Sequence, residues 1–163
     1  MIVVEPVPAD DPRVVPIIEA HVGLMDATTA DPDACHRLDL SGLLAPHITF
    51  FGAFDRGTAI GIGAYAHFGE WGEVKSMHVL AAARGNGVAR RILDAIEARA
   101  RELSADVIRL ETGAAFDAAI ALYRSAGFTP CGAFGGYPDH PLSRFFEKTL
   151  SVVSTSSTTG RKR

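Results

Sequence analysis

Residues 84–89, Arg84-Gly85-Asn86-Gly87-Val88-Ala89, lie between a strand-like run that ends at Leu80 and a strongly periodic helix that begins near Val88. The first N–H groups of a helix have no partner within the helix, and the helix macrodipole makes that end positive. A glycine-bearing turn in front of such groups is suited to an anion. Arg90 and Arg91 add positive charge where acidic residues are usual. The stretch therefore predicts a ligand that carries phosphate.

The composition predicts one globular domain. The chain has 163 residues, 47% of them hydrophobic and 21% charged, with a net charge of −3 and a pI of about 6.0. This balance implies no broad basic face, so nucleic acid is not expected as a partner. Because the start of the chain lacks a signal-peptide pattern and no apolar stretch reaches transmembrane length, we expect a cytoplasmic protein without a membrane partner. Cys35 and Cys131 have no metal-site spacing, so no metal is expected.

The hydrophobic pattern predicts a mixed α/β fold. Strands are expected over 2–7, 49–55, 60–68, 73–80, 106–112 and 145–150, and helices from residue 10 or 11 to about 25, around 35–40, from 88, and over 116–126. An antiparallel first half thus meets a βαβ unit, whose right-handed crossover places the helix from Val88 against the sheet. We expect a single domain over 1–150 and a disordered C-terminal tail over 151–163, which cannot bury a core.

Two common phosphate loops do not fit the glycine turn. A P-loop requires Lys and then Ser or Thr after its last glycine, and a dinucleotide-binding loop requires a sixth-place glycine, where this chain has Arg90. ATP and NAD are therefore not expected. The pattern R-x-x-G-x-A, formed by Arg84, Gly87 and Ala89, resembles the pyrophosphate loop of the GNAT acetyltransferase superfamily, which binds acetyl-CoA.

The flanking sequence carries the same resemblance. Residues 75–79, Lys-Ser-Met-His-Val, resemble the fourth strand of that family, and residues 121–128 resemble its L-Y-x-x-x-G-F segment. The resemblance extends over 2–150 and includes a bacterial, largely uncharacterised branch of N-acetyltransferases. It implies a GNAT-like fold, with a central, mostly antiparallel twisted sheet, a βαβ CoA-binding unit and flanking helices. Dimers are common in this superfamily, so a homodimer stays open.

The resemblance implies acetyl-CoA as co-substrate. Backbone N–H groups of the glycine turn would face the pyrophosphate, and the backbone of 77–79 would pair with pantetheine like an added strand. The implied cofactor-binding residues are Met77, His78, Val79, Arg84, Gly85, Asn86, Gly87, Val88, Ala89 and Arg90. Many members carry an Asn that contacts the pantetheine arm at the position of Phe116, so that contact is not expected here.

Tyr123 is the candidate general acid. Its hydroxyl has a reference pKa of about 10, above the roughly 8.5 of a thiol, so it stays protonated and can share its proton with the departing thiolate. The alternative is an amphipathic-helix tyrosine that packs in the core beside Phe116 and Ile120.

Glu73 and Glu111 are the candidate bases that take the proton of the amine, directly or through water. The alternative for each is a strand-end carboxylate, with Glu73 paired to Lys75. The strand alternation predicts one face with Glu73, Lys75, Met77 and Val79, and places His78 on the opposite face.

Loops before the last strand and after the first helix are expected to wall the acceptor pocket. Tyr137, Arg144 and His36 are the candidate substrate residues, although a surface position for Arg144 and simple packing for Trp71 are the competing interpretations. The predicted function is direct acetyl transfer from acetyl-CoA to a primary amine of a small molecule. The alternatives are a protein lysine or N-terminal acetyltransferase and a non-catalytic CoA-binding regulatory domain.

Overall fold

A computed structural model of the chain describes residues 1–29, 31 and 37–150; the expected tail over 151–163 lies outside this range. The strands are β1 (Ile2–Pro6), β2 (Ile48–Asp55), β3 (Thr58–His67), β4 (Trp71–Val79), β5 (Val107–Gly113), β6 (Thr129–Pro130) and β7 (Ser143–Thr149). The helices are α1 (Val15–Thr28), α2 (Leu40–Leu43), α3 (Val88–Glu102) and α4 (Asp117–Ser125), with a 3₁₀ turn, η2 (Ala81–Ala83), before the glycine loop.

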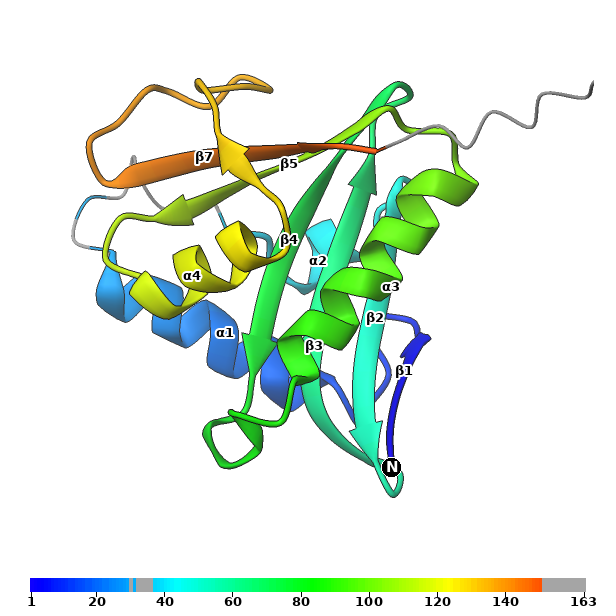
Figure 1. The fold of residues 1–163 in the computed structure, drawn as a ribbon. Coiled ribbons are helices and arrows are strands. Elements are labelled where there is room, and N and C mark those ends of the chain that lie inside the picture. The colour runs from blue at the N-terminus through cyan, green and yellow to red at the C-terminus, as the bar shows by residue number, and fades with distance from the viewer. Residues whose placement is uncertain (30, 32–36, 151–163) are drawn as a thin grey trace, which may run out of the picture.

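The seven strands form one twisted sheet in the order β1-β2-β3-β4-β5-β7-β6 (Figure 1). Neighbouring strands are antiparallel except β4 and β5, which the α3 crossover joins in parallel. The mixed α/β fold with a mostly antiparallel sheet is therefore confirmed. Among the described residues, no helix combines the length and apolarity needed to cross a bilayer.

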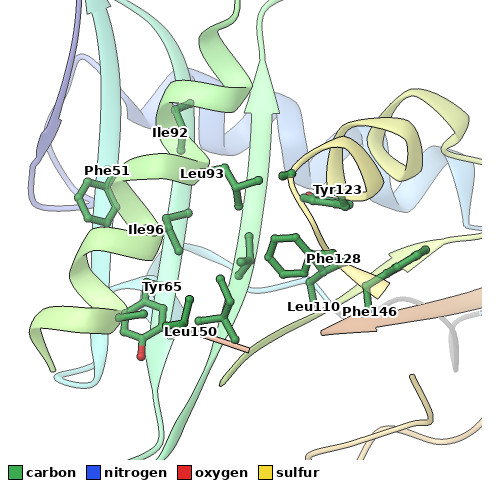
Figure 2. Packing of buried hydrophobic residues seen from close by; sticks show 14 of the residues in the cluster. Phe51, Tyr65, Ile92, Leu93, Ile96, Leu110, Tyr123, Phe128, Phe146 and Leu150 are labelled. Carbon is green, nitrogen blue, oxygen red and sulfur yellow. The ribbon is translucent and has the colours of Figure 1, made fainter. Parts of the chain in front are cut away.

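Helices cover both faces of the sheet. Ile92 and Ile96 of α3 are fully buried in a core cluster with Tyr65 (Figure 2). A Cβ on Gly63 would collide with Ile92, so the glycine lets α3 approach β3 closely. The second cluster, on the other face, joins Ile17 and other residues of α1 to the buried side of β2 and β3.

β4 contains a bulge that the sequence pattern did not predict. Its pairing with β3 shifts by one residue, since His78 faces Ile62 whereas Lys75 faces Ala64. Ser76, inside this shift, has a φ of 55°. An extra residue in one strand of a pair is a β-bulge, and it moves every later side chain to the opposite face.

The bulge corrects the predicted strand faces. His78 lies on the α1 face together with Glu73 and Lys75, because Ile62, Ala64 and Ala66 of β3 alternate regularly opposite them. Met77 lies on the α3 face, where its sulfur would be 2.7 Å from a Cβ placed on Gly63. The prediction that His78 points away from Glu73 is therefore wrong, as is the shared face for Glu73 and Met77.

β4 and β5 separate soon after they pair. Their parallel ladder joins Trp71–Glu73 to Val107–Arg109, and β5, which pairs with β7 along its whole length, then diverges from β4 (Figure 1). Beyond Glu73, the edge of β4 that faces β5 has no strand beside it in the described part of the chain. The separation opens the sheet at the point where the sequence placed the candidate site.

Two local predictions differ from the structure, and one short strand was not predicted. α1 begins at Val15, not at residue 10 or 11, because the Asp11 carboxylate binds the backbone N–H of Arg13 at 2.9 Å within a preceding turn. The short helix expected around 35–40 begins at Leu40, where the Asp39 side chain accepts a capping bond from Gly42 N–H; residues 35 and 36 lie outside the described part. The two-residue β6 was not predicted.

Candidate active site

A cavity of about 820 Å³ occupies the gap between β4 and β5. It reaches from the glycine loop at the start of α3 to the C-terminal half of α1, so it opens toward both faces of the sheet. The predicted catalytic residues Glu73, Glu111 and Tyr123 all line it, as does Tyr137. So do Met77, His78, Val79, Arg84 and Ala89 of the predicted cofactor site.

The glycine loop leaves the start of α3 open to a ligand. Gly85 and Gly87 have φ values of 82° and 75°, and no atom lies within 4 Å of a Cβ built on either. Gly87 is the N-cap of α3, no side chain caps the helix, and its first turn contains no acidic residue. The Asn86 amide donates to the carbonyl of Ala83 at 3.1 Å and so fastens the loop to η2. This is the geometry expected of a helix-terminal anion site.

The three arginines of this region have different surroundings. Arg84 lines the cavity. Arg90 contacts Asp94 at 3.3 Å on the exposed side of α3, and Arg91 donates to the carbonyl of Ile2 at 2.9 Å. Arg84 is therefore the arginine best placed to meet an anion at the loop.

A closed hydrogen-bonded triangle lies on the α1 face of the cavity. Lys75 Nζ donates to Glu73 Oε2 at 2.8 Å and to Tyr137 Oη at 2.7 Å, and Tyr137 Oη donates to the same Glu73 oxygen at 2.5 Å. Glu73 is 5% exposed. Burial, followed by the negative charge of Glu73 and the hydrogen bond to it, raises the pKa of Tyr137. Glu73 is thus a charge-compensated carboxylate with two donors on one oxygen.

Glu111 lies on the same face of the sheet but has a different environment. Burial raises the pKa of its carboxyl; the Ser143 hydroxyl and Lys75 oppose this effect, and the charge of Glu73 adds to it. A carboxyl with a raised pKa is a stronger base once it is ionised. Of the two predicted bases, Glu111 therefore has the environment that favours proton uptake.

Tyr123 faces the cavity from the other side. The residue is 6% exposed and packs edge-to-face on Phe128 with 5.9 Å between ring centroids. Burial, followed by the charge of Glu111, raises the pKa of its hydroxyl, so the hydroxyl stays protonated at neutral pH. Tyr123 therefore belongs to the hydrophobic core and also lines the cavity, and its role as general acid stays a prediction.

A half-buried lysine fixes the helix that carries Tyr123. Lys148 Nζ on β7 donates to the carbonyl of Ala126 and to Glu97 Oε1 of α3, both at 2.8 Å. Gly127 follows with a φ of 93°, in the left-handed conformation typical of a residue just beyond a helix. Together these contacts hold the end of α4 against α3 and β7.

His21 and His78 close the cavity between α1 and β4. Their Nδ1 atoms are 3.3 Å apart, and their rings meet edge-to-face. Burial, and secondly His78, lower the pKa of His21 to about 4; burial and Arg84 lower that of His78. Both rings are thus neutral at pH 7.

In the described part of the chain, no three His, Cys, Asp or Glu side chains gather closely enough to hold a metal ion.

The predicted acceptor residues have different positions. Tyr137 comes from the loop between β6 and β7, held by Phe134, whose ring also packs on Trp71 and Phe145. Trp71 thus supports the loop and does not line the cavity. Arg144 donates to the carbonyls of Pro141 and Ser143 at 2.9 and 3.1 Å and lies outside the cavity lining. His36 lies outside the described residues.

Sequence reasoning missed other residues of the site. It considered Lys75 only as a partner of Glu73, and it assigned no site role to His21, Arg37 or Leu142, all of which line the cavity. The helical periodicity of α1 places His21 on its buried face, which is a signal for burial and not for a site. No pattern in the sequence signals the others, because they come from segments far apart in the chain.

Comparisons with known proteins agree with this geometry. The sequence profile of the acetyltransferase (GNAT) family matches residues 20–128. A protein of Azospirillum brasilense named IAA acetyltransferase is 46% identical over 117 residues, which are 71% of this chain and 76% of that protein.

Two solved structures extend the comparison. A Klebsiella pneumoniae protein, named as an acyl-CoA N-acyltransferase, superposes with a TM-score of 0.77 at 28% identity, covering 93% of this chain and 99% of that one. The acetyltransferase yncA of Salmonella typhimurium, solved with its cofactor acetyl-CoA, has the same fold, with a TM-score of 0.68 at 20% identity over 96% and 98% of the two chains. The chain therefore belongs to the GNAT acetyltransferase family and is an acyltransferase.

Proposed function

We propose that this acyltransferase moves an acetyl group from acetyl-CoA directly to the primary amine of a small molecule. The observation that carries the proposal is that one continuous cavity passes between the separated strands, with Tyr123 on one side and Glu111 on the other. A thioester that enters from the α3 side and an amine that enters from the α1 side would meet between these two groups. The Salmonella relative that binds acetyl-CoA supports the choice of donor.

The donor would lie along the glycine loop and β4. Its pyrophosphate meets the N–H groups of residues 85–89 and the charge of Arg84, and its pantetheine arm pairs with the open edge of β4 around Met77, His78 and Val79. Phe116 lines the cavity beside this path and offers an apolar surface in place of an amide. A backbone N–H of the bulged strand is the candidate donor to the thioester carbonyl oxygen.

Glu111 is the proposed base. An alkylammonium must lose a proton before its nitrogen can attack the thioester carbon, and Glu111 takes that proton directly or through water. Glu73 serves less well, because its Oε2 already accepts from both Lys75 and Tyr137. The Glu73 triangle instead supplies a fixed polar wall for the acceptor.

Tyr123 assists the leaving group. The C–N bond forms, the C–S bond breaks, and negative charge collects on the sulfur, which receives the hydrogen bond and then the proton of the Tyr123 hydroxyl. The second proton of the attacking nitrogen leaves to water, and water returns a proton to Tyr123, so that the products are the amide and the free thiol. Because the raised pKa makes complete proton transfer less favourable, the main contribution of Tyr123 is the hydrogen bond in the transition state.

The test is thiol release from acetyl-CoA by Tyr123→Phe, with CoA affinity measured by calorimetry. We expect kcat to fall by about 10- to 100-fold and the CoA dissociation constant to change less than about twofold. Tyr65→Phe is the matched control, because it removes another tyrosine hydroxyl from the same core. The Tyr65 hydroxyl is hydrogen-bonded to His67 at 2.8 Å, and neither residue lines the cavity. An unchanged kcat would refute the role of Tyr123. Absence of both CoA binding and thiol release with every amine would refute the proposed function.

A further inference from the structure

The α1 side of the cavity has an apolar wall. Leu24 and Met25 of α1, Leu38 and Leu142 all line it. Leu24 and Leu142 are large apolar side chains that remain 37% and 44% exposed, and they come from segments near opposite ends of the described chain. Exposed apolar side chains that converge on a concave site indicate a ligand with an apolar surface.

The charges of the same region are largely compensated within the protein. Lys75 pairs with Glu73, and at the edge of the cavity Arg37 pairs with Asp26 at 2.7 Å. Asp31 contacts His140 at 2.8 Å. The lining also contains Asp117, which lies at the start of α4 and so away from the α1 wall.

Glu111 is the remaining carboxylate of the described lining on the α1 face. It has Lys75 near enough to lower its pKa, but burial has the larger and opposite effect. An alkylammonium beside Glu111 would therefore compensate a half-buried charge that the protein compensates only in part. A second ammonium, farther along the acceptor, would meet the leucines and Met25.

On the basis of the proposed function, we propose that the acceptor is a monoamine with an apolar body. Its ammonium lies beside Glu111, and its aliphatic or aromatic body lies against Leu24, Met25, Leu38 and Leu142. Polyamines and aminoglycosides are poor acceptors, because a charged group moved from water onto an apolar wall loses its hydration without a partner.

The test compares hexylamine with hexamethylenediamine, which has the same chain and a second amine. With wild-type protein and saturating acetyl-CoA, we expect kcat/KM for hexylamine to be about 10-fold higher or more. Two reactive amines would by themselves give the diamine the higher kcat/KM, so a preference for hexylamine has to come from the second charge. Phenethylamine, a monoamine with an aromatic body, should behave like hexylamine.

A charge placed on the wall should reverse the preference. Leu142→Glu gives the second ammonium a partner and should shift the ratio of the two kcat/KM values by about 10-fold toward the diamine. Leu142 is 44% exposed, so the substitution is compatible with folding. Leu44→Glu is the matched control, at a leucine that is 49% exposed and lies outside the cavity lining, and it should leave the ratio unchanged.

The outcomes separate this inference from the proposed function. If wild-type protein uses the diamine as well as hexylamine, or acetylates an aminoglycoside amine and neither of these two, the apolar-body inference is wrong while acetyl transfer to small-molecule amines stands. Acetylation of a peptide amine and of neither small amine would overturn both. If Leu142→Glu and Leu44→Glu shift the ratio equally, the inference is wrong as well. If no amine is acetylated, the proposed function fails together with it.

Discussion

The two faces of the cavity are built by different means. On the α3 side, the loop at residues 84–89 offers backbone groups, and its shape depends on two glycines close together in sequence. On the α1 side, the site consists of side chains from five segments: α1, the stretch before α2, β4, β5 and the loop before β7. The first arrangement suits an anion, and the second depends on side chains that single substitutions can change.

The faces also differ in how they treat charge. The start of α3 keeps uncapped N–H groups and Arg84 at the surface, where water solvates them until an anion binds. The α1 side buries Glu73, half-buries Glu111 and compensates mainly the charge of Glu73. Substitutions in the glycine loop on the α3 side should therefore change affinity for the donor, and substitutions of the carboxylates on the α1 side should change turnover.

The largest expected effect is on the α1 side. Glu111→Gln keeps the size of the side chain and removes the base, so kcat should fall by about 100-fold or more, with CoA affinity unchanged within about twofold. In wild-type protein, kcat/KM should fall as the pH drops through the raised pKa of Glu111, because the protonated carboxyl cannot take the amine proton. Stopped-flow thiol release over a pH series measures both.

Glu73→Gln is the comparison for this prediction. It keeps an acceptor for Lys75 and Tyr137 and should reduce kcat by less than Glu111→Gln does. If kcat falls more in Glu73→Gln than in Glu111→Gln, Glu73 is the base and Glu111 is not.

The second effect is on the α3 side. Gly87→Ala places a Cβ at a φ of 75°, which is unfavourable for an L-residue and should tilt the N–H groups at the start of α3. We expect the CoA dissociation constant to rise by about 10-fold and kcat at saturating donor to stay within about threefold of wild type. Calorimetric titration with CoA gives the first value and thiol release the second.

Gly57→Ala is a matched control for backbone strain. Gly57 has a φ of 81° and open space at its Cβ position, but it lies in the turn between β2 and β3. Both variants should lose similar thermal stability, and only Gly87→Ala should bind CoA more weakly. Equal CoA affinity in the two variants would mean that the loop is not the pyrophosphate site.

The same contrast explains how far the sequence predicted the molecule. Apolar periodicity predicted most strands and the helix α3, and Gly87 predicted the loop, because these signals are local. The bulge at Ser76 was missed, since a strand pattern does not reveal which residue its partner will skip. That one residue is enough to move His78 to the α1 face.

The α1 side was predicted only as a set of separate candidates. Glu73, Glu111 and Tyr137 were named, but the Glu73–Lys75–Tyr137 triangle was not, because Lys75 and Tyr137 are 62 positions apart. Such contacts arise only when the loop before β7 folds over β4. The apolar wall was missed for the same reason, as Leu24 and Leu142 become neighbours of one cavity only in the folded chain.

The smallest expected effect is on thermal stability. It tests the incompletely compensated charge on the α1 side without any substrate. The pKa of Glu111 is higher in the folded state than its usual value, so the folded protein binds this proton more tightly than the unfolded chain does. Wild-type protein therefore loses stability as the pH rises through that raised pKa, whereas Glu111→Gln does not. At about pH 7, we expect Glu111→Gln to melt a few degrees higher than wild type. At about pH 4, the two proteins should melt at nearly the same temperature.

Glu70→Gln, at an exposed position in the turn before β4, should melt like wild type at both pH values. If Glu111→Gln is the less stable protein at neutral pH, its carboxylate is compensated in the folded state, and the argument for an incoming ammonium loses its basis. If Glu111→Gln is more stable than wild type at neutral pH, the substitution has removed a charge that destabilises the folded protein. A residue that is needed for turnover and destabilises the fold is expected to be kept for catalysis and not for folding.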